Sequence, residues 1–258
     1  MTDANARAAA GAPSGAPPGS DGPDVPGATD SVALSAAEWQ FASMQRAGLY
    51  GWFCRLYAQE VPEDVYRAHF AEGSFAPFAG LAELGLAAEV QRLDAAIAAL
   101  RAEQLPHLEL AADFAQLFLL DGKTSALPYA SAYEGKDAAS PLYGAAEARM
   151  REFLAARNLT LQAGFREPAD HLAVPLALMA ELAQKDAAVG DIAQSAAAQA
   201  AFLRSALLDW LARFVDRCRQ ARPRFDVYPA LAALLLGFVR ADALFLEDVA
   251  RSAPADAA

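Results

Sequence analysis

The sequence predicts an all-α protein, and three observations lead to this prediction. Ala and Leu dominate the 55% of residues that are hydrophobic; both are strong helix formers, and β-branched residues are sparse. Hydrophobic residues recur at helical spacing in segments that Pro, Gly and Ser separate. No alternating strand pattern exceeds four residues, and no internal repeat is found. We therefore expect a single globular domain of roughly nine helices around one core.

The chain is expected to contain one folded region between two irregular ends. Residues 1–33 are rich in Ala, Gly, Pro, Ser and Asp and contain no aromatic residue, a composition typical of a disordered tail. The helical domain is expected over residues 34–250. Residues 251–258 are expected to fray.

Helix signals follow one another along the domain. The first helix begins at Ser35, which forms a capping box with Glu38, and Pro62 is expected near the N1 position of the second. Further helices are expected over residues 85–103 and, after Pro106, over "HLELAADFAQLFLL". Four more follow the long loop 121–133: from Ser140-Pro141 to about Arg157, from the EPADHL segment to about Gln184, and over residues 198–220 and 226–249.

Charge and cysteine content narrow the classes of partner and compartment. The chain has 21 basic and 32 acidic residues, a formal net charge of −11. Nucleic acid is therefore excluded as an expected partner, because phosphate binding needs clustered Lys and Arg, whereas cationic peptides would be attracted. Cys54 and Cys218 are expected to be buried, reduced thiols, which fits a reducing compartment. No apolar run of 18 residues and no secretory signal is found, so no membrane span is expected.

The segment "GFREPADHLAVPLALMAEL" places three ionisable residues at the start of an apolar helix. With Pro168 at N1, Glu167 would be the N-cap and Asp170 the N3 residue, where carboxylates meet free backbone N–H groups. His171 would be N4, and capping does not explain a histidine there. It is either a satisfied core histidine or a functional group.

A metal or catalytic site is a weaker interpretation of the same residues. Glu167 and His171 share a helix face and could supply two ligands, but His69 and His107 each stand alone and HExxH is absent. No nucleophile motif, no Walker motif and no GxGxxG is found, so no cofactor is expected. The alternatives left open are a helical metallohydrolase using Glu167, Asp170 and His171, and a general assembly scaffold.

Aromatic residues precede and follow the break in the helical pattern. Phe114 and Phe118 are one helical turn apart, and Tyr129 and Tyr133 lie in the loop. Core packing explains the phenylalanines simply. Tyrosines in a Pro-containing loop favour peptide recognition, because tyrosine combines a rigid apolar ring with a polar tip.

Two segments in this order resemble the TorD/DmsD family of redox-enzyme maturation chaperones. "DFAQLFLLDGKTSALPYASAYE" is similar to the family's aromatic-x-x-Leu-Phe helix and its Pro-aromatic-x-Ser-x-aromatic loop, and "EPADHL" is similar to its Glu-Pro-x-Asp-His-Leu signature. "AFLRSALLDWLARF" resembles the family's Phe…Leu-x-x-Trp helix. The family often has a histidine immediately before that leucine, where this chain has Ala206. The resemblance covers roughly residues 38–248.

The resemblance implies a TorD-like, non-enzymatic, cytoplasmic chaperone. Such proteins bind the twin-arginine leader peptide and the apo-form of a molybdoenzyme and hold the enzyme until its cofactor is inserted before export. They act as monomers or helix-swapped dimers. The motifs place peptide binding at Asp170, His171, Glu167, Pro168, Phe114, Phe118, Tyr129, Ser131 and Tyr133.

Overall fold

The computed structural model describes residues 34–71, 80–120, 125–134, 144–188 and 190–252. They belong to one of the two units into which the chain divides, Val32–Ala258. Regular structure within these ranges is helical, apart from an isolated bridge between Tyr129 and His171. The predicted all-α class is confirmed. The tail predicted over residues 1–33 and most of the predicted frayed end lie outside the described residues.

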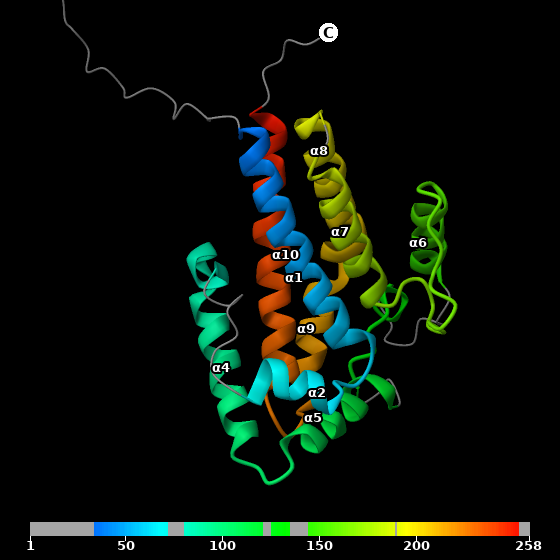
Figure 1. Cartoon of the computed structure of the whole chain (residues 1–258). Coiled ribbons are helices and arrows are strands. Elements are labelled where there is room, and N and C mark those ends of the chain that lie inside the picture. Colours follow the sequence, from blue (N-terminus) through cyan, green and yellow to red (C-terminus); the bar gives the residue numbers. More distant parts are fainter. Residues whose placement is uncertain (1–33, 72–79, 121–124, 135–143, 189, 253–258) are drawn as a thin grey trace, which may run out of the picture. The chain divides into compact units, whose positions relative to one another are not determined.

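Two long helices, α1 (Ala36–Ala58) and α10 (Val227–Arg251), form the centre of the domain (Figure 1). α1 begins with the predicted capping box: Ser35 Oγ accepts from the Glu38 N–H at 3.3 Å, and Glu38 Oε2 accepts from the Ser35 N–H at 2.9 Å. α7 (Ala173–Asp186) packs on α1, and α8 (Ile192–Leu203), α9 (Asp209–Ala221) and α4 (Ala87–Arg101) pack on α10. The core therefore forms where helices distant in sequence meet.

Shorter elements complete the domain. They are α2 (Glu63–Tyr66), η1 (Arg67–Ala71), η2 (Ala82–Leu86), α5 (Pro106–Phe114), η3 (Ala115–Leu119), the 3₁₀ turn η4 (Ala130–Tyr133), α6 (Ala145–Ala155) and η5 (Arg204–Leu208). Pro62 is the N-cap of α2 rather than its N1 residue. The helix start predicted at Ser140-Pro141 lies outside the described residues, and α6 begins at Ala145 with Gly144 as its N-cap.

Long apolar faces account for the central position of α10. By length and composition this helix could cross a membrane, and 61% of its most apolar 18-residue window is buried inside the protein. Gly237 permits the close approach of η2, because a Cβ there would lie 2.7 Å from Leu86 Cδ2. The two cysteines are free thiols, as predicted: Cys218 is buried and Cys54 partly buried.

One charged network lies inside this core. The Arg46 guanidinium on α1 donates to Asp242 Oδ1 on α10 at 2.5 Å and to Gln199 Oε1 on α8 at 2.7 Å. Tyr50 donates to Asp242 Oδ2 at 2.7 Å. Burial raises the pKa of Tyr50, and the adjacent Asp242 carboxylate adds to the rise. The network joins three helices at positions where the sequence alone suggests isolated charges.

Candidate functional site

The EPADHL segment and the Pro-containing loop lie against each other. The Leu172 N–H donates to Pro128 O at 2.7 Å, and the Ala130 N–H donates to Asp170 O at 3.1 Å. We call these paired segments, residues 128–134 and 167–172, the corner. The predicted functional residues of the loop and of the EPADHL segment therefore share one small region.

α7 begins later than predicted. Its first residue is Ala173 and its N-cap is Leu172, so Glu167 is not an N-cap and Asp170 is not at N3. Pro175 explains the difference. In a helix that began at Pro168, the Pro175 ring would clash with the His171 carbonyl and a helical hydrogen bond would be missing. From Ala173 onward, Pro175 occupies the first turn, where backbone N–H groups need no helical partner.

Asp170 holds the loop instead of capping its own helix. Its Oδ2 accepts from the Ser131 N–H at 2.8 Å, in the first turn of η4. The residue is only 2% exposed. Within the part of the chain that the structure describes, Asp170 Oδ1 and Ser131 Oγ are buried without a hydrogen-bond partner. Buried polar atoms of this kind call for an explanation, and a bound ligand would supply one.

Glu167 is fixed by the loop as well. Its Oε2 accepts from the Tyr129 hydroxyl at 2.6 Å. The carboxylate is half-buried, so it retains acceptor capacity toward solvent or a ligand.

His171 is buried between two rings and takes the capping role that the sequence assigned to its neighbours. Its Nδ1 accepts from the Ala173 N–H at 3.1 Å. Tyr129 and Phe165 contact the imidazole edge-on, with ring centroids at 5.1 and 5.6 Å. Burial lowers the pKa of His171 to about 4, although the Glu167 charge acts in the opposite direction. The ring is therefore neutral at pH 7, and its proton sits on Nε2 because Nδ1 is an acceptor.

The corner separates two pockets. The first, the Tyr129 pocket, has a volume of about 430 Å³ and is lined by Ala58, Gln59, Glu60, Phe114, Phe118, Leu119, Pro128, Tyr129, Glu167 and His171. The second, the Trp210 pocket, has a volume of about 290 Å³, and Asp170 lines it. The adjacent residues Asp170 and His171 thus serve different pockets, which the sequence does not suggest.

The Tyr129 pocket is acidic and apolar. Glu60 and Glu167 supply two carboxylates, and none of the described lining residues is a lysine or an arginine. Leu119 adds an exposed apolar side chain. This combination suits a cationic group carried on an apolar chain.

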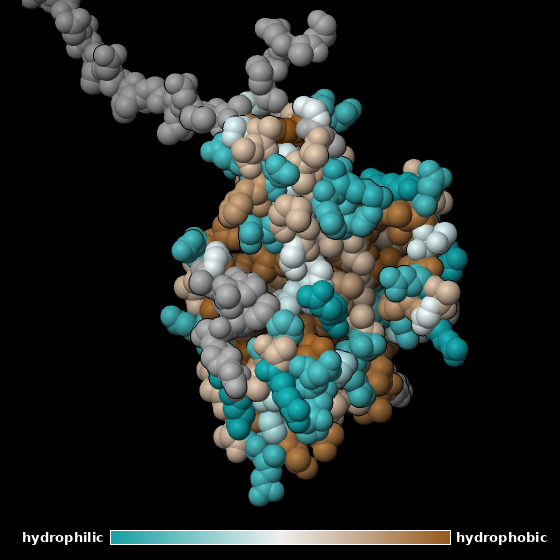
Figure 2. Space-filling view, viewed as in Figure 1, coloured by the Kyte–Doolittle hydropathy of each residue, from teal (hydrophilic) through white to brown (hydrophobic). Residues whose placement is uncertain are grey.

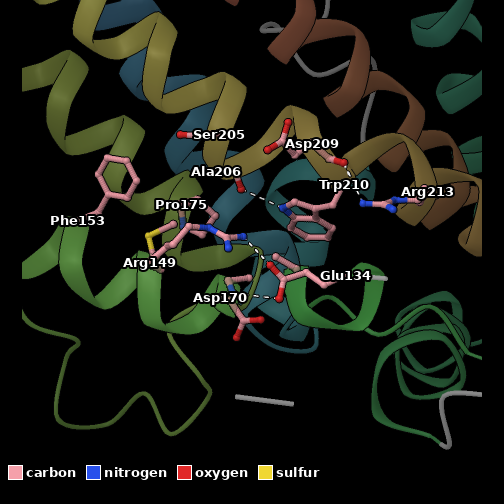
Figure 3. Close-up of a pocket in the computed structure, with 13 residues that line it drawn as sticks. Glu134, Arg149, Phe153, Asp170, Pro175, Ser205, Ala206, Asp209, Trp210 and Arg213 are labelled. Carbon is pink, nitrogen blue, oxygen red and sulfur yellow. Dashed lines mark hydrogen bonds and ion pairs between the residues drawn. The ribbon is translucent and has the colours of Figure 1, made fainter. Parts of the chain in front are cut away.

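The Trp210 pocket carries charges of both signs (Figure 3). Arg149 pairs with Glu134 at 2.5 Å, and Arg213 donates to the Asp209 carbonyl at 3.0 Å. Trp210 Nε1 donates to the Ala206 carbonyl at 2.9 Å. Ala206, the position that departs from the family pattern, therefore lines a pocket, where its small side chain leaves room.

The remaining predicted residues have structural roles. Phe114 and Phe118 are only 3% exposed; Phe118 contacts the rings of Tyr57 and Tyr228 at 5.8 and 5.3 Å. They form the floor of the Tyr129 pocket rather than an open apolar groove. The ring of Tyr133 stacks on that of Trp210, with centroids 5.5 Å apart, and Tyr133 does not line the Tyr129 pocket. Pro168 is buried, and its carbonyl accepts from the His171 N–H.

Several lining residues escape the sequence analysis: Glu60, Glu134, Arg149 and Arg213. No motif marks them, since the helix ends and exposed helix faces that carry them look like ordinary solvated surface. π-helical turns partly indicate where the functional site lies, but they are visible only in the structure. η3 carries Phe118 and η5 carries Ala206, and π turns are frequent at functional sites.

A metal centre receives no support from these side chains. Among the residues with described positions, no group of three or more His, Cys, Asp and Glu side chains could hold a metal ion. The ligand set that the metallohydrolase hypothesis needs is therefore not assembled around His171.

Comparison with known proteins identifies the family. The family model described as "Nitrate reductase delta subunit" matches residues 82–216. The chain is 39% identical over 221 residues to the "Chaperone protein TorD" of Psychrobacter sp. (strain PRwf-1), covering 84% of this chain and 99% of the relative. The chain belongs to the TorD family. Chaperone proteins TorD of Vibrio cholerae and Actinobacillus pleuropneumoniae are each 38% identical and are each covered over 96% of their length. The corner is therefore a feature of a TorD family member, and the match to the Psychrobacter relative covers nearly all of that relative's length.

Proposed function

We propose that this TorD family member is a cytoplasmic, system-specific chaperone for a molybdoenzyme. It binds the twin-arginine leader peptide and the apo-form of its client and holds the client until the cofactor is inserted before export. Its relatives are named chaperones. The observation that carries the proposal is the Tyr129 pocket, which sets two carboxylates beside aromatic rings, with no lysine or arginine among its described lining residues.

Arginine side chains of a leader fit this pocket chemically. A guanidinium can make short, charge-assisted hydrogen bonds to the carboxylates of Glu60 and Glu167. Its planar face can stack on the Tyr129 ring. The net charge of −11 attracts a cationic peptide from a distance.

The two buried residues of the corner have different tasks in this proposal. The neutral His171 presents Nε2–H to the Tyr129 pocket, where it can donate to a peptide carbonyl. Asp170 keeps the loop in place through Ser131. Asp170 is therefore a positioning residue for the Tyr129 pocket, while His171 contacts the peptide.

Calorimetry with synthetic leaders tests the proposal. A panel would hold twin-arginine leaders of trimethylamine-oxide, dimethyl-sulfoxide, formate and nitrate-type enzymes. We expect one leader to bind, and Arg-Arg to Gln-Gln replacement in it to reduce affinity. Glu60→Gln and Glu167→Gln should each weaken binding about tenfold, and added salt should weaken it further.

Glu152→Gln is the matched control, because Glu152 is an exposed carboxylate on α6 outside both pockets. It should bind like the wild type. If no leader binds, or if the Glu60 and Glu167 variants match the control, the leader-binding proposal is wrong.

A further inference from the structure

A third hollow, lined by α1, η2 and α10, lies outside the corner. It has a volume of about 790 Å³. We call it the α1 groove; the side chains and backbone that define it are Phe41, Met44, Gly48, Trp52, Leu84 and Phe245. Figure 2 shows hydrophobic surface on this side of α1, next to the element that leads into α4.

The α1 groove exposes large apolar side chains to water. Phe41 is 69% exposed and Leu84 is 57% exposed. Contiguous exposed apolar surface of this kind marks interaction sites in soluble proteins. By contrast, the phenylalanines of the Tyr129 pocket are buried, so the α1 groove offers a ligand aromatic surface that the Tyr129 pocket does not.

Gly48 gives the groove a short stretch of bare helix backbone. It lies in the middle of α1, where glycine is unfavourable compared with alanine. A Cβ at Gly48 would have no described heavy atom within 4 Å, so packing within the described domain does not require glycine. A bare backbone at this point lets the chain of a partner approach α1 closely.

Arg46 gives the groove one unused donor. The guanidinium is buried and its charge is matched by Asp242. Its Nη1 has no hydrogen-bond partner among the described residues, and Arg46 lines the groove. Because the charge is already balanced, the missing partner is a neutral acceptor such as a peptide carbonyl rather than a second carboxylate.

The α1 groove is continuous with the Tyr129 pocket along one stripe of α1. The stripe consists of residues spaced three or four apart within α1, which place them on a single helix face: Phe41, Gln45, Gly48, Trp52, Arg55 and Ala58. The first five line the groove and Ala58 lines the Tyr129 pocket. At a rise of 1.5 Å per residue, the groove section of the stripe is roughly 21 Å long.

We propose that the α1 groove binds the apolar stretch of the same leader peptide whose basic residues occupy the Tyr129 pocket, an inference that rests on the proposed function. Leader peptides carry a basic region followed by about 7–15 apolar residues. As a helix this stretch is roughly 10–22 Å long, which matches the groove. The bound helix runs antiparallel to α1, from Ala58 toward Phe41.

The antiparallel direction supplies an acceptor for Arg46 Nη1, which has no hydrogen-bond partner among the described residues. The last carbonyls of a helix have no partner within the helix. In the antiparallel orientation these carbonyls reach the half of the groove nearest the start of α1, which contains Arg46. Arg46 Nη1 then donates to one of them.

Gly48→Leu tests the proposal by filling the groove without disturbing the fold, because the added side chain meets open space. Two synthetic peptides are titrated by calorimetry: the whole leader, and the same leader truncated before its apolar stretch. We expect Gly48→Leu to reduce affinity for the whole leader at least tenfold, to the level of the truncated peptide. Affinity for the truncated peptide should stay unchanged.

Two variants make the result specific. Ala98→Leu adds apolar bulk to the exposed face of α4, outside the groove, and should leave both affinities unchanged. Glu167→Gln should weaken both peptides, since it acts on the basic region. Circular dichroism and urea unfolding should show all three variants folded.

Wild-type affinity of Gly48→Leu for the whole leader would overturn the groove assignment and leave the proposed function standing. If neither peptide binds the wild-type protein, both proposals fail. If Gly48→Leu weakens binding only of the leaderless apo-enzyme, the groove serves the client's body, and the assignment to the leader is overturned.

Discussion

Asp170 Oδ2 lies 2.8 Å from the backbone nitrogen of Ser131, although 39 residues separate the two positions in the chain. This bond joins the EPADHL segment to the Tyr-containing loop. The wall between the Tyr129 and Trp210 pockets therefore depends on one buried carboxylate, whose second oxygen has no partner among the described residues.

Replacing the Asp170 carboxylate should lower the stability of the fold directly and affect peptide binding only through that change. We expect Asp170→Ala to lower the free energy of unfolding by about 1–3 kcal/mol, because the Ser131 N–H would be left buried and unpaired. Asp170→Asn retains an acceptor oxygen and should lose less. Urea unfolding monitored by circular dichroism measures both. Asp216→Ala, at an exposed carboxylate on α9, is the control and should change stability by less than about 0.5 kcal/mol. Equal stability of Asp170→Ala and the control would show that the bond does not hold the corner.

Phe118 should behave as a core residue. Its ring lies among those of Tyr57, Phe114, Phe214 and Tyr228. We expect Phe118→Ala to destabilise the protein by about 3–5 kcal/mol, as measured by chemical denaturation. Leu119→Ala removes an exposed neighbour and should be much milder. A Phe118 variant of wild-type stability would place the ring at the surface instead.

The buried His171 should make the protein acid-sensitive. Its folded-state pKa of about 4 lies below the usual 6.5, so the unfolded chain binds more protons between these values. The stability that neutral His171 provides is present above pH 6.5 and is lost as the pH falls toward 4, up to about 3 kcal/mol. His171→Asn retains an acceptor for the Ala173 N–H but does not titrate.

The difference in unfolding free energy between wild type and His171→Asn, measured from pH 7 to pH 4, isolates this effect from the carboxylates. The difference should shift in favour of the variant as the pH falls. A constant difference would mean that His171 titrates normally.

The Arg46–Asp242 pair should show strong coupling. Arg46→Met leaves the Asp242 carboxylate buried without its cation and should cost about 3–5 kcal/mol. Adding Asp242→Leu should recover much of that loss, because an apolar pair can replace a buried ion pair. Thermal and urea unfolding of the two single variants and the double variant complete the cycle. Additive losses would contradict the direct interaction seen between Arg46 and Asp242.

Much of the fold of this chain could be predicted from helical periodicity. The all-α class, the capping box at Ser35 and the helices around Phe114 and Leu234 follow from spacing and composition, since those signals are local. The start of α7 could also have been placed correctly, because Pro175 forbids a helix that begins at Pro168.

The site was only partly predictable because pairing between distant segments has no local signature. The two motifs single out Tyr129, Glu167 and His171, and in the structure these three residues line one pocket. Nothing in the sequence indicates that Asp170 serves the opposite pocket, or that η2 and α10 form a groove with α1. Such relationships depend on which helices pack together, and spacing within one helix does not determine that.

α6 is attached to the rest of the domain by few interactions and stands apart from the central helices (Figure 1). Glu134 receives the Ala146 N–H and pairs with Arg149, and Phe153 contacts Phe202 at 5.1 Å. Opening free energies follow the buried contacts of an element, so the amides of α6 should exchange with deuterium long before those of α10. We therefore expect the Trp210 pocket, which Arg149 and Phe153 line from α6 and Trp210 lines from α9, to change in width as α6 moves.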